Sequence, residues 1–337
     1  MPARMPNRPE FPLAASAKPV KLDELRRSRR DLLRLAAGGA GALGLSALLA
    51  ACSGRGSTPT KQSSSPAGSI GAVGEGATQL SLINAQSKLT TGRQLFTFGL
   101  STPDNNLVSE GKPQVWAAKD ETSKALGPFP AKWLMMDAYD KTGDKSPRSP
   151  LVGFYAAEVE LPGTGNWLVA AVVDEGGRRG VGRGAVPVVD KVVAQVGSKA
   201  LAVPTLVAKG TSDLDKVCTR NPPCPMHDIS LDRAIRSGKA TAVSFATPLF
   251  CSSQMCGPAV DELLLVSRDV GAKANFVHVE IYPNEENPSK PVKAFTKWGF
   301  DSEPWTIVID AKGVVRARFE GPVTAAEITE ALHPLLG

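Results

Sequence analysis

The chain has 337 residues, of which 42% are hydrophobic and 21% charged, a composition that suits two globular domains with ordinary cores. The formal net charge is +6, but residues 1–51 hold 9 of the 39 basic residues and only 4 of the 33 acidic ones. The rest of the chain is therefore close to neutral, which argues against a nucleic-acid-binding surface. With only three histidines in the chain, a histidine-rich metal site is not expected either.

Residues 1–51 have the pattern of an export signal. Five arginines between positions 26 and 34 precede residues 35–51, an uncharged stretch of Leu, Ala, Gly and one Ser. A basic segment followed by a short apolar segment is typical of a secretory signal peptide, and this apolar stretch is shorter than the roughly 20 residues of a membrane span. Residues 28–34 (SRRDLLR) resemble a twin-arginine (Tat) export motif, with Leu and Arg where Phe and Lys are usual.

Residues 49–52 (LAAC) resemble a lipobox. The resemblance implies cleavage before Cys52 and attachment of a diacylglyceryl group to it. We therefore expect a lipoprotein anchored to the cell membrane on its extracytoplasmic face, a compartment that permits disulfide bonds. A plain secretory signal or an N-terminal anchor helix is the alternative.

Residues 52–77 are predicted to form a disordered tether behind this anchor. After Cys52 they are almost entirely Ser, Gly, Thr, Pro and Ala, which bury too little apolar surface to fold. A flexible tether of this length reaches roughly 25–30 Å from the membrane.

Residues 78–190 are predicted to form an immunoglobulin-like β-sandwich. Six short apolar or alternating runs, separated by turn signals rich in Gly, Pro, Asn and Asp, are typical of such a domain; they cover residues 80–83, 95–100, 114–118, 132–136, 155–161 and 167–173. Arg178, Arg179 and Arg183 are assigned to a Gly-rich, solvated turn. Nothing in this domain suggests chemistry, so it is expected to act as a spacer or docking surface.

Residues 191–225 are interpreted as a connecting segment, and residues 226–337 as an α/β domain. Strands are predicted at 240–245, 276–281, 305–310 and 314–319, with helices at 259–270 and 325–332. Strands separated by helices favour parallel pairing through crossover connections, and the last two strands form an antiparallel hairpin at the edge.

Besides Cys52, the chain has four cysteines in two close pairs. An even number in an oxidising compartment favours two disulfides. Cys218 and Cys224 bracket a stiff Pro-Pro loop and are interpreted as a structural disulfide. His227 follows them closely, and the sequence does not decide whether it reaches the other pair.

Cys251 and Cys256 lie where a strand ends and a helix begins. Pro258 suits a first helical turn, which places Cys256 at the helix N-terminus, where free N–H groups and the helix dipole favour a thiolate. Cys256 is therefore the predicted nucleophile of a redox-active centre, with Cys251 as the resolving partner.

Three strings make residues 226–337 resemble the thioredoxin-like superfamily, and in particular TlpA-type envelope proteins. Residues 256–258 (CGP) resemble the opening of the thioredoxin active site, residues 303–306 (EPWT) its cis-proline loop, and residues 309–322 its last hairpin and the entry to the final helix. The resemblance implies a thiol–disulfide oxidoreductase acting on cell-envelope proteins, in which Pro304 shapes the substrate groove. Two positions depart from the family: Ala259 replaces its second active-site cysteine, and Ser244 its buried aspartate.

The same cysteines are compatible with other functions. A resemblance to Sco-type copper assembly factors would make Cys251, Cys256 and His278 a soft ligand set for copper. A peroxiredoxin-like mechanism would use Cys256 with Ser253, and a non-catalytic thioredoxin-fold scaffold would use neither cysteine. Outside the copper alternative, no cofactor or metal is expected.

Overall fold

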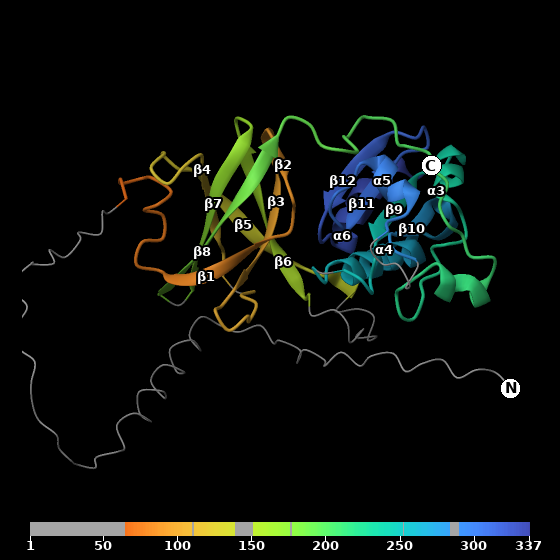
Figure 1. The fold of residues 1–337 in the computed structure, drawn as a ribbon, viewed down its shortest axis with the longest axis horizontal. Coiled ribbons are helices and arrows are strands. Elements are labelled where there is room, and N and C mark those ends of the chain that lie inside the picture. The colour runs from red at the N-terminus through yellow and green to blue at the C-terminus, as the bar shows by residue number, and fades with distance from the viewer. Residues whose placement is uncertain (1–64, 110, 139–150, 176, 252, 284–289) are drawn as a thin grey trace, which may run out of the picture.

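The computed structural model describes residues 65–337 except 110, 139–150, 176, 252 and 284–289. The predicted signal peptide, Cys52 and the first half of the tether lie outside these residues. Figure 1 shows two units side by side: a β unit, and an α/β unit in which helices surround a small sheet. Among the described helices, none combines the length and the apolar composition needed to cross a membrane.

The β unit contains the six predicted strand regions and two strands that were not predicted. Its strands are β1 (Thr78–Asn84), β2 (Leu89–Thr90), β3 (Gly92–Ser101), β4 (Gln114–Ala118), β5 (Leu126–Met135), β6 (Gly153–Leu161), β7 (Gly165–Glu175) and β8 (Arg178–Val189). They pair in the order β1-β3-β6-β5-β4-β7-β8, and β8 pairs again with β1, so the sheet closes into a ring. The short strand β2 adds to β8 in parallel. Inward-facing side chains, including Phe96, Phe98 and Tyr155, fill the interior.

The immunoglobulin-like sandwich is not confirmed, because the strand pairs form a ring instead of two separate sheets. The difference lies in β8, whose arginines and glycines indicated a turn. This strand pairs with β7 along its whole length and with β1 in parallel. The glycines of β8 let its backbone lie close to the side chains of neighbouring strands. A Cβ on Gly182 would lie 2.6 Å from Leu100 Cδ2, and a Cβ on Gly180 would lie 2.7 Å from Leu80 Cδ1.

Residues 65–77 belong to this unit and not to a tether, which corrects the predicted boundary. Ile70 is only 2% exposed and packs in a small cluster with Val181 of β8. The Arg183 guanidinium donates hydrogen bonds to the carbonyls of Ile70 (2.8 Å) and Gly71 (3.2 Å). Ile70 and the neighbouring Val73 provide the apolar surface that lets this small-residue segment fold.

The α/β unit contains the predicted strands and the two predicted helices in the predicted order, with one further helix before them and another between the second and third strands. It contains α3 (Leu231–Arg236), β9 (Thr241–Ala246), α4 (Cys256–Val270), β10 (Asn275–Glu280), α5 (Lys293–Trp298), β11 (Trp305–Ile309), β12 (Val315–Glu320) and α6 (Ala325–Leu332). The sheet order is β10-β9-β11-β12. Strands β9 and β10 are parallel, as predicted for a crossover through α4, whereas β11 is antiparallel to both β9 and β12.

The two faces of this sheet carry separate cores because strand side chains alternate. Val243 and Phe245 of β9 face a core shared with α3 and α5 that contains Trp298 and Trp305. Ala242 and Ala246 face the opposite core, shared with α4 and α6. Cys256 lies in this second core, which therefore underlies the predicted active site.

The connecting segment and the residues that follow it, up to residue 228, cover both edges of the sheet. On the β12 side, Gly197 N–H donates to Val315 O (2.8 Å) and Ala200 N–H to Gly313 O (2.9 Å). On the β10 side, Met226 O accepts the His278 N–H at 2.8 Å. Covering edge strands in this way satisfies their backbone groups and brings residues 217–228 against β10.

A buried carboxylate joins the two units. Glu262 of α4 is fully buried and accepts hydrogen bonds from Ala138 N–H (2.7 Å), which follows β5, and from Ala325 N–H (2.6 Å), which opens α6. Burial raises the pKa of Glu262 to about 7, against the effect of both donors. A second bridge joins Ser87 N–H to Glu320 Oε1 at 2.8 Å.

Replacing Glu262 by alanine is expected to lower the free energy of unfolding by about 2–4 kcal/mol, because two buried N–H groups lose their acceptor. Urea denaturation of the variant measures the loss. Glu330→Ala, on the exposed face of α6, is the matched control and should change stability by less than about 0.5 kcal/mol. Equal stability of the two variants would contradict a structural role for Glu262.

Candidate active site

The loop between β9 and α4 folds the Cys251–Cys256 segment into a compact turn. Phe250 N–H donates to Thr247 O at 3.2 Å, and Gln254 adopts a left-handed conformation with φ of 59°. Helix α4 then begins at Cys256, as predicted. A turn of this kind is what two cysteines separated by four residues need in order to approach each other.

The two cysteines differ sharply in exposure. Cys256 is fully buried in the core beneath α4, whereas Cys251 is half-buried and packs at the margin of the same core. The Cys256 N–H points at Cys251 Sγ at a distance of 3.4 Å, and Ser253 Oγ lies 3.2 Å from the same sulfur. The N-terminus of α4 therefore directs its first N–H group at Cys251.

This geometry gives the two thiols different pKa values. A hydrogen bond from the Cys256 thiol lowers the pKa of Cys251 to about 6, helped by Ser253 and by the N–H groups that open the helix. Burial raises the pKa of Cys256 above its usual range, and the adjacent Cys251 raises it further. The helix N-terminus therefore points its first N–H at the sulfur of the preceding loop and not at Cys256, the thiolate that the sequence pattern predicts.

Pro304 lies on the loop that enters β11, beside this pair. The Glu303–Pro304 peptide bond is cis, as the family resemblance implies, and Pro304 O accepts the Gly321 N–H at 2.9 Å. Burial raises the pKa of Glu303, and the charge of Cys251 raises it further. Tyr282, whose pKa is raised by burial and then by Glu303 and Cys256, completes this surrounding. The sequence pattern did not single out either side chain.

The two departures from the thioredoxin pattern are both buried. Ala259 lies in the core face of α4, so no cysteine follows Cys256 within the first helical turn. Ser244 is buried on β9, and its hydroxyl has no hydrogen-bond partner among the described residues. No carboxylate therefore occupies the position of the family's buried aspartate, and the carboxylate whose charge acts on Cys256 is Glu303, on the cis-proline loop.

Cys218 and Cys224 do not form the predicted disulfide. Their Sγ atoms are 3.8 Å apart, well beyond the S–S bond of about 2.05 Å. Instead, both sulfurs face the imidazoles of His227 and His278. The copper site predicted from Cys251, Cys256 and His278 is therefore not formed by these three side chains. The His278 ring contacts Cys218 and Cys224 instead.

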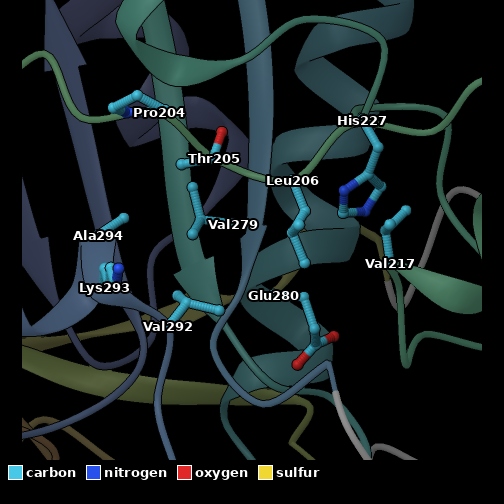
Figure 2. A pocket seen from close by; sticks show the side chains of 10 residues that line it. All are labelled: Pro204, Thr205, Leu206, Val217, His227, Val279, Glu280, Val292, Lys293 and Ala294. Atoms are coloured by element: carbon cyan, nitrogen blue, oxygen red, sulfur yellow. The ribbon is translucent and has the colours of Figure 1, made fainter.

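A largely apolar cavity of about 330 Å³ lies on the β10 side of the unit. Figure 2 shows Leu206 in its centre, with the His227 ring and Val217 at one end and Glu280 below. Its lining residues come from the connecting segment, β10 and α5, and do not include Cys251 or Cys256. The cavity therefore borders the cysteine–histidine cluster and is separate from the redox pair.

Comparisons with known proteins add similarities of limited extent. No protein-family model matches the chain, and no curated protein matches its sequence. Similar solved structures include a thioredoxin-family thiol:disulfide interchange protein from Chlorobium tepidum (21% identity, 41% of this chain and 100% of that one, TM-score 0.27). A secreted thiol-disulfide isomerase from Corynebacterium glutamicum is also similar (15% identity, 29% of this chain and 71% of that one, TM-score 0.25). So is StoA from Bacillus subtilis (16% identity, 39% of this chain and 98% of that one, TM-score 0.26).

The α/β unit is thioredoxin-like on its own features: the β9-α4-β10 crossover, the antiparallel β11–β12 hairpin, the closing helix α6, and a cis-proline loop beside a cysteine pair at the start of α4.

The rate at which Cys251 reacts with iodoacetamide is expected to rise with pH around a midpoint of about 6, well below the ordinary thiol value of 9.0, since the thiolate is the reactive form. Peptide mass spectrometry after timed alkylation measures this rate for Cys251 alone. In Cys256→Ala the midpoint should move upward, because the variant removes the thiol donor. A midpoint near 9.0 that is unchanged by Cys256→Ala would contradict the assigned geometry.

Proposed function

We propose that this protein is a membrane-anchored, extracytoplasmic thiol–disulfide oxidoreductase that acts on cell-envelope proteins, with Cys251 as the nucleophile and Cys256 as the resolving cysteine. The observation that carries the proposal is the pairing of a half-buried sulfur of low pKa with a buried thiol at the start of one helix. The lipobox at residues 49–52 supports the anchor, with the lipid on Cys52.

The proposed reaction begins with the Cys251 thiolate. It attacks one sulfur of a substrate disulfide, forming a mixed disulfide and releasing the second substrate sulfur as a thiolate. Cys256 then loses its proton and attacks Cys251 Sγ, which releases the first substrate sulfur. The substrate gains two electrons and two protons, one proton from Cys256 and one from solvent, and the protein is left with a Cys251–Cys256 disulfide. Every step is reversible, so the same chemistry transfers a disulfide to a dithiol substrate.

The surroundings of the pair support this division of roles. A substrate sulfur can reach the half-buried Cys251, whereas Cys256 is shielded until the mixed disulfide forms. Ionisation of Cys256 is unfavourable while Cys251 is an anion, because the adjacent charge raises its pKa. Once Cys251 is bonded to substrate, that charge is gone and Cys256 becomes easier to ionise. In this scheme Glu303, whose pKa is raised by burial and by Cys251, accepts the proton.

Cys256→Ala is expected to trap the mixed disulfide on Cys251, since the resolving thiol is missing. Incubating the full chain with a peptide that contains one disulfide, followed by non-reducing mass spectrometry, measures the adduct. Cys251→Ala is the matched variant and should form no adduct at Cys256, because that sulfur is buried and protonated.

Two outcomes would contradict the proposal. An adduct on Cys256 in the Cys251→Ala variant would restore the opposite assignment of roles. If neither variant changed the rate of peptide-disulfide exchange relative to the unaltered chain, the cysteine pair would not be catalytic and the scaffold alternative would stand.

A further inference from the structure

We infer that Cys218, Cys224, His227 and His278 form a closed, four-coordinate site for Zn²⁺ that fixes the connecting segment against the redox loop. The ligand atoms of these four residues all lie within 4.8 Å of one another, and all four side chains are buried. Cysteine and histidine in a two-plus-two set are typical ligands of structural zinc.

Four of the six distances between ligand atoms match the edges of a zinc tetrahedron, and the other two, from His227 to the two sulfurs, are no longer than 4.8 Å. With Zn–S of about 2.3 Å and Zn–N of about 2.0–2.1 Å, two sulfurs are expected about 3.8 Å apart, a sulfur and a nitrogen about 3.5 Å, and two nitrogens about 3.3 Å. The Cys218 and Cys224 sulfurs are 3.8 Å apart, and His278 Nδ1 lies 3.6 and 3.3 Å from them. His227 Nε2 is 3.1 Å from His278 Nδ1.

Charge and burial also favour a divalent cation. Cys218, Cys224, His227 and His278 are each no more than 4% exposed. Two thiolates and two neutral imidazoles around Zn²⁺ make a site with no net charge, which a buried position tolerates far better than an unpaired ion.

Surrounding groups orient the ligands. His278 Nε2 lies 3.3 Å from Ala246 O, so a proton on Nε2 leaves the Nδ1 lone pair directed at the two sulfurs. The Cys224 N–H points at Cys218 Sγ at 3.5 Å, a contact that favours the thiolate. His278 comes from β10 and the other three ligands from the segment before α3, so the site joins the edge of the sheet to that segment.

The same segment contacts the redox loop and its helix. Thr219 Oγ1 accepts the Leu249 N–H at 3.2 Å, and the Arg220 guanidinium pairs with Asp261 of α4 at 2.6 Å. Both residues directly follow Cys218, so a metal on that sulfur holds the segment where it meets the cysteine loop. The cavity in Figure 2 reaches the His227 side of the cluster and provides a route of entry for the ion.

The test measures metal directly and needs no redox assay. The full chain is stripped with a chelator under reducing conditions, incubated with excess Zn²⁺ and desalted; elemental analysis is expected to find about one zinc per chain. X-ray absorption should give two sulfurs at about 2.3 Å and two nitrogens at about 2.0–2.1 Å. The Cys218→Ser/Cys224→Ser variant should retain less than about a tenth of the zinc, whereas Cys251→Ser/Cys256→Ser should retain all of it.

A folding control and a competing metal keep the test decisive. His278→Gln removes one ligand while leaving both sulfurs, and should weaken zinc binding at least about tenfold with the circular dichroism spectrum unchanged. Zinc that survives loss of Cys218 and Cys224, or that is lost with Cys251 and Cys256, would overturn the assignment. A chain that binds Cu⁺ but no Zn²⁺, or one in which Cys218 and Cys224 are recovered as a disulfide that excludes zinc, would overturn it as well.

Discussion

The proposed chemistry depends on the different positions of the Cys251 and Cys256 sulfurs relative to the first turn of α4. Its N–H groups and the Cys256 thiol converge on Cys251, while the body of the helix packs Cys256 into the core. A helix N-terminus stabilises an anion only where the anion can face it. The sulfur that precedes the helix satisfies that condition, and the sulfur on its first residue, turned inward, does not.

This constraint explains why a Cys-x4-Cys spacing can replace the thioredoxin Cys-x2-Cys spacing on the same fold. In the proposed mechanism the nucleophile lies on the loop before the helix, and the left-handed Gln254 lies in that loop. Ala259, at the position of the usual second cysteine, fills the core instead of providing a thiol. The pair thus keeps one reachable and one shielded sulfur, with the reachable sulfur first along the chain.

Much of the α/β unit could be predicted from sequence because its elements have strong local signals: buried β-branched runs, a periodic helix and a proline-marked helix start. The antiparallel direction of β11 had no local signal. The ring of the β unit was missed because Gly-rich β8 resembles a turn, and only its tight packing against Leu80 and Leu100 explains those glycines. The tether boundary was misplaced because the two apolar residues Ile70 and Val73 were outweighed by small ones.

At the two cysteine sites, the sequence pattern identifies every cysteine but not every side chain that contacts them. The spacing of Cys218 and Cys224 fits a disulfide as well as a metal site, and His278 is 54 residues beyond Cys224, so only the fold brings it to both sulfurs. Likewise, which of Cys251 and Cys256 is shielded depends on the packing beneath α4. These features arise from tertiary contacts that a linear pattern does not contain.

The central claim is that the two cysteine pairs have different chemistry: one exchanges disulfides and the other holds a metal. A redox titration of the zinc-loaded full chain, with each cysteine followed by differential alkylation and mass spectrometry, tests it most directly. The account predicts that Cys251 and Cys256 interconvert between dithiol and disulfide at a potential within about −300 to −120 mV, while Cys218 and Cys224 stay unoxidised. Cycling of Cys218 and Cys224 with a static Cys251–Cys256 pair would contradict it.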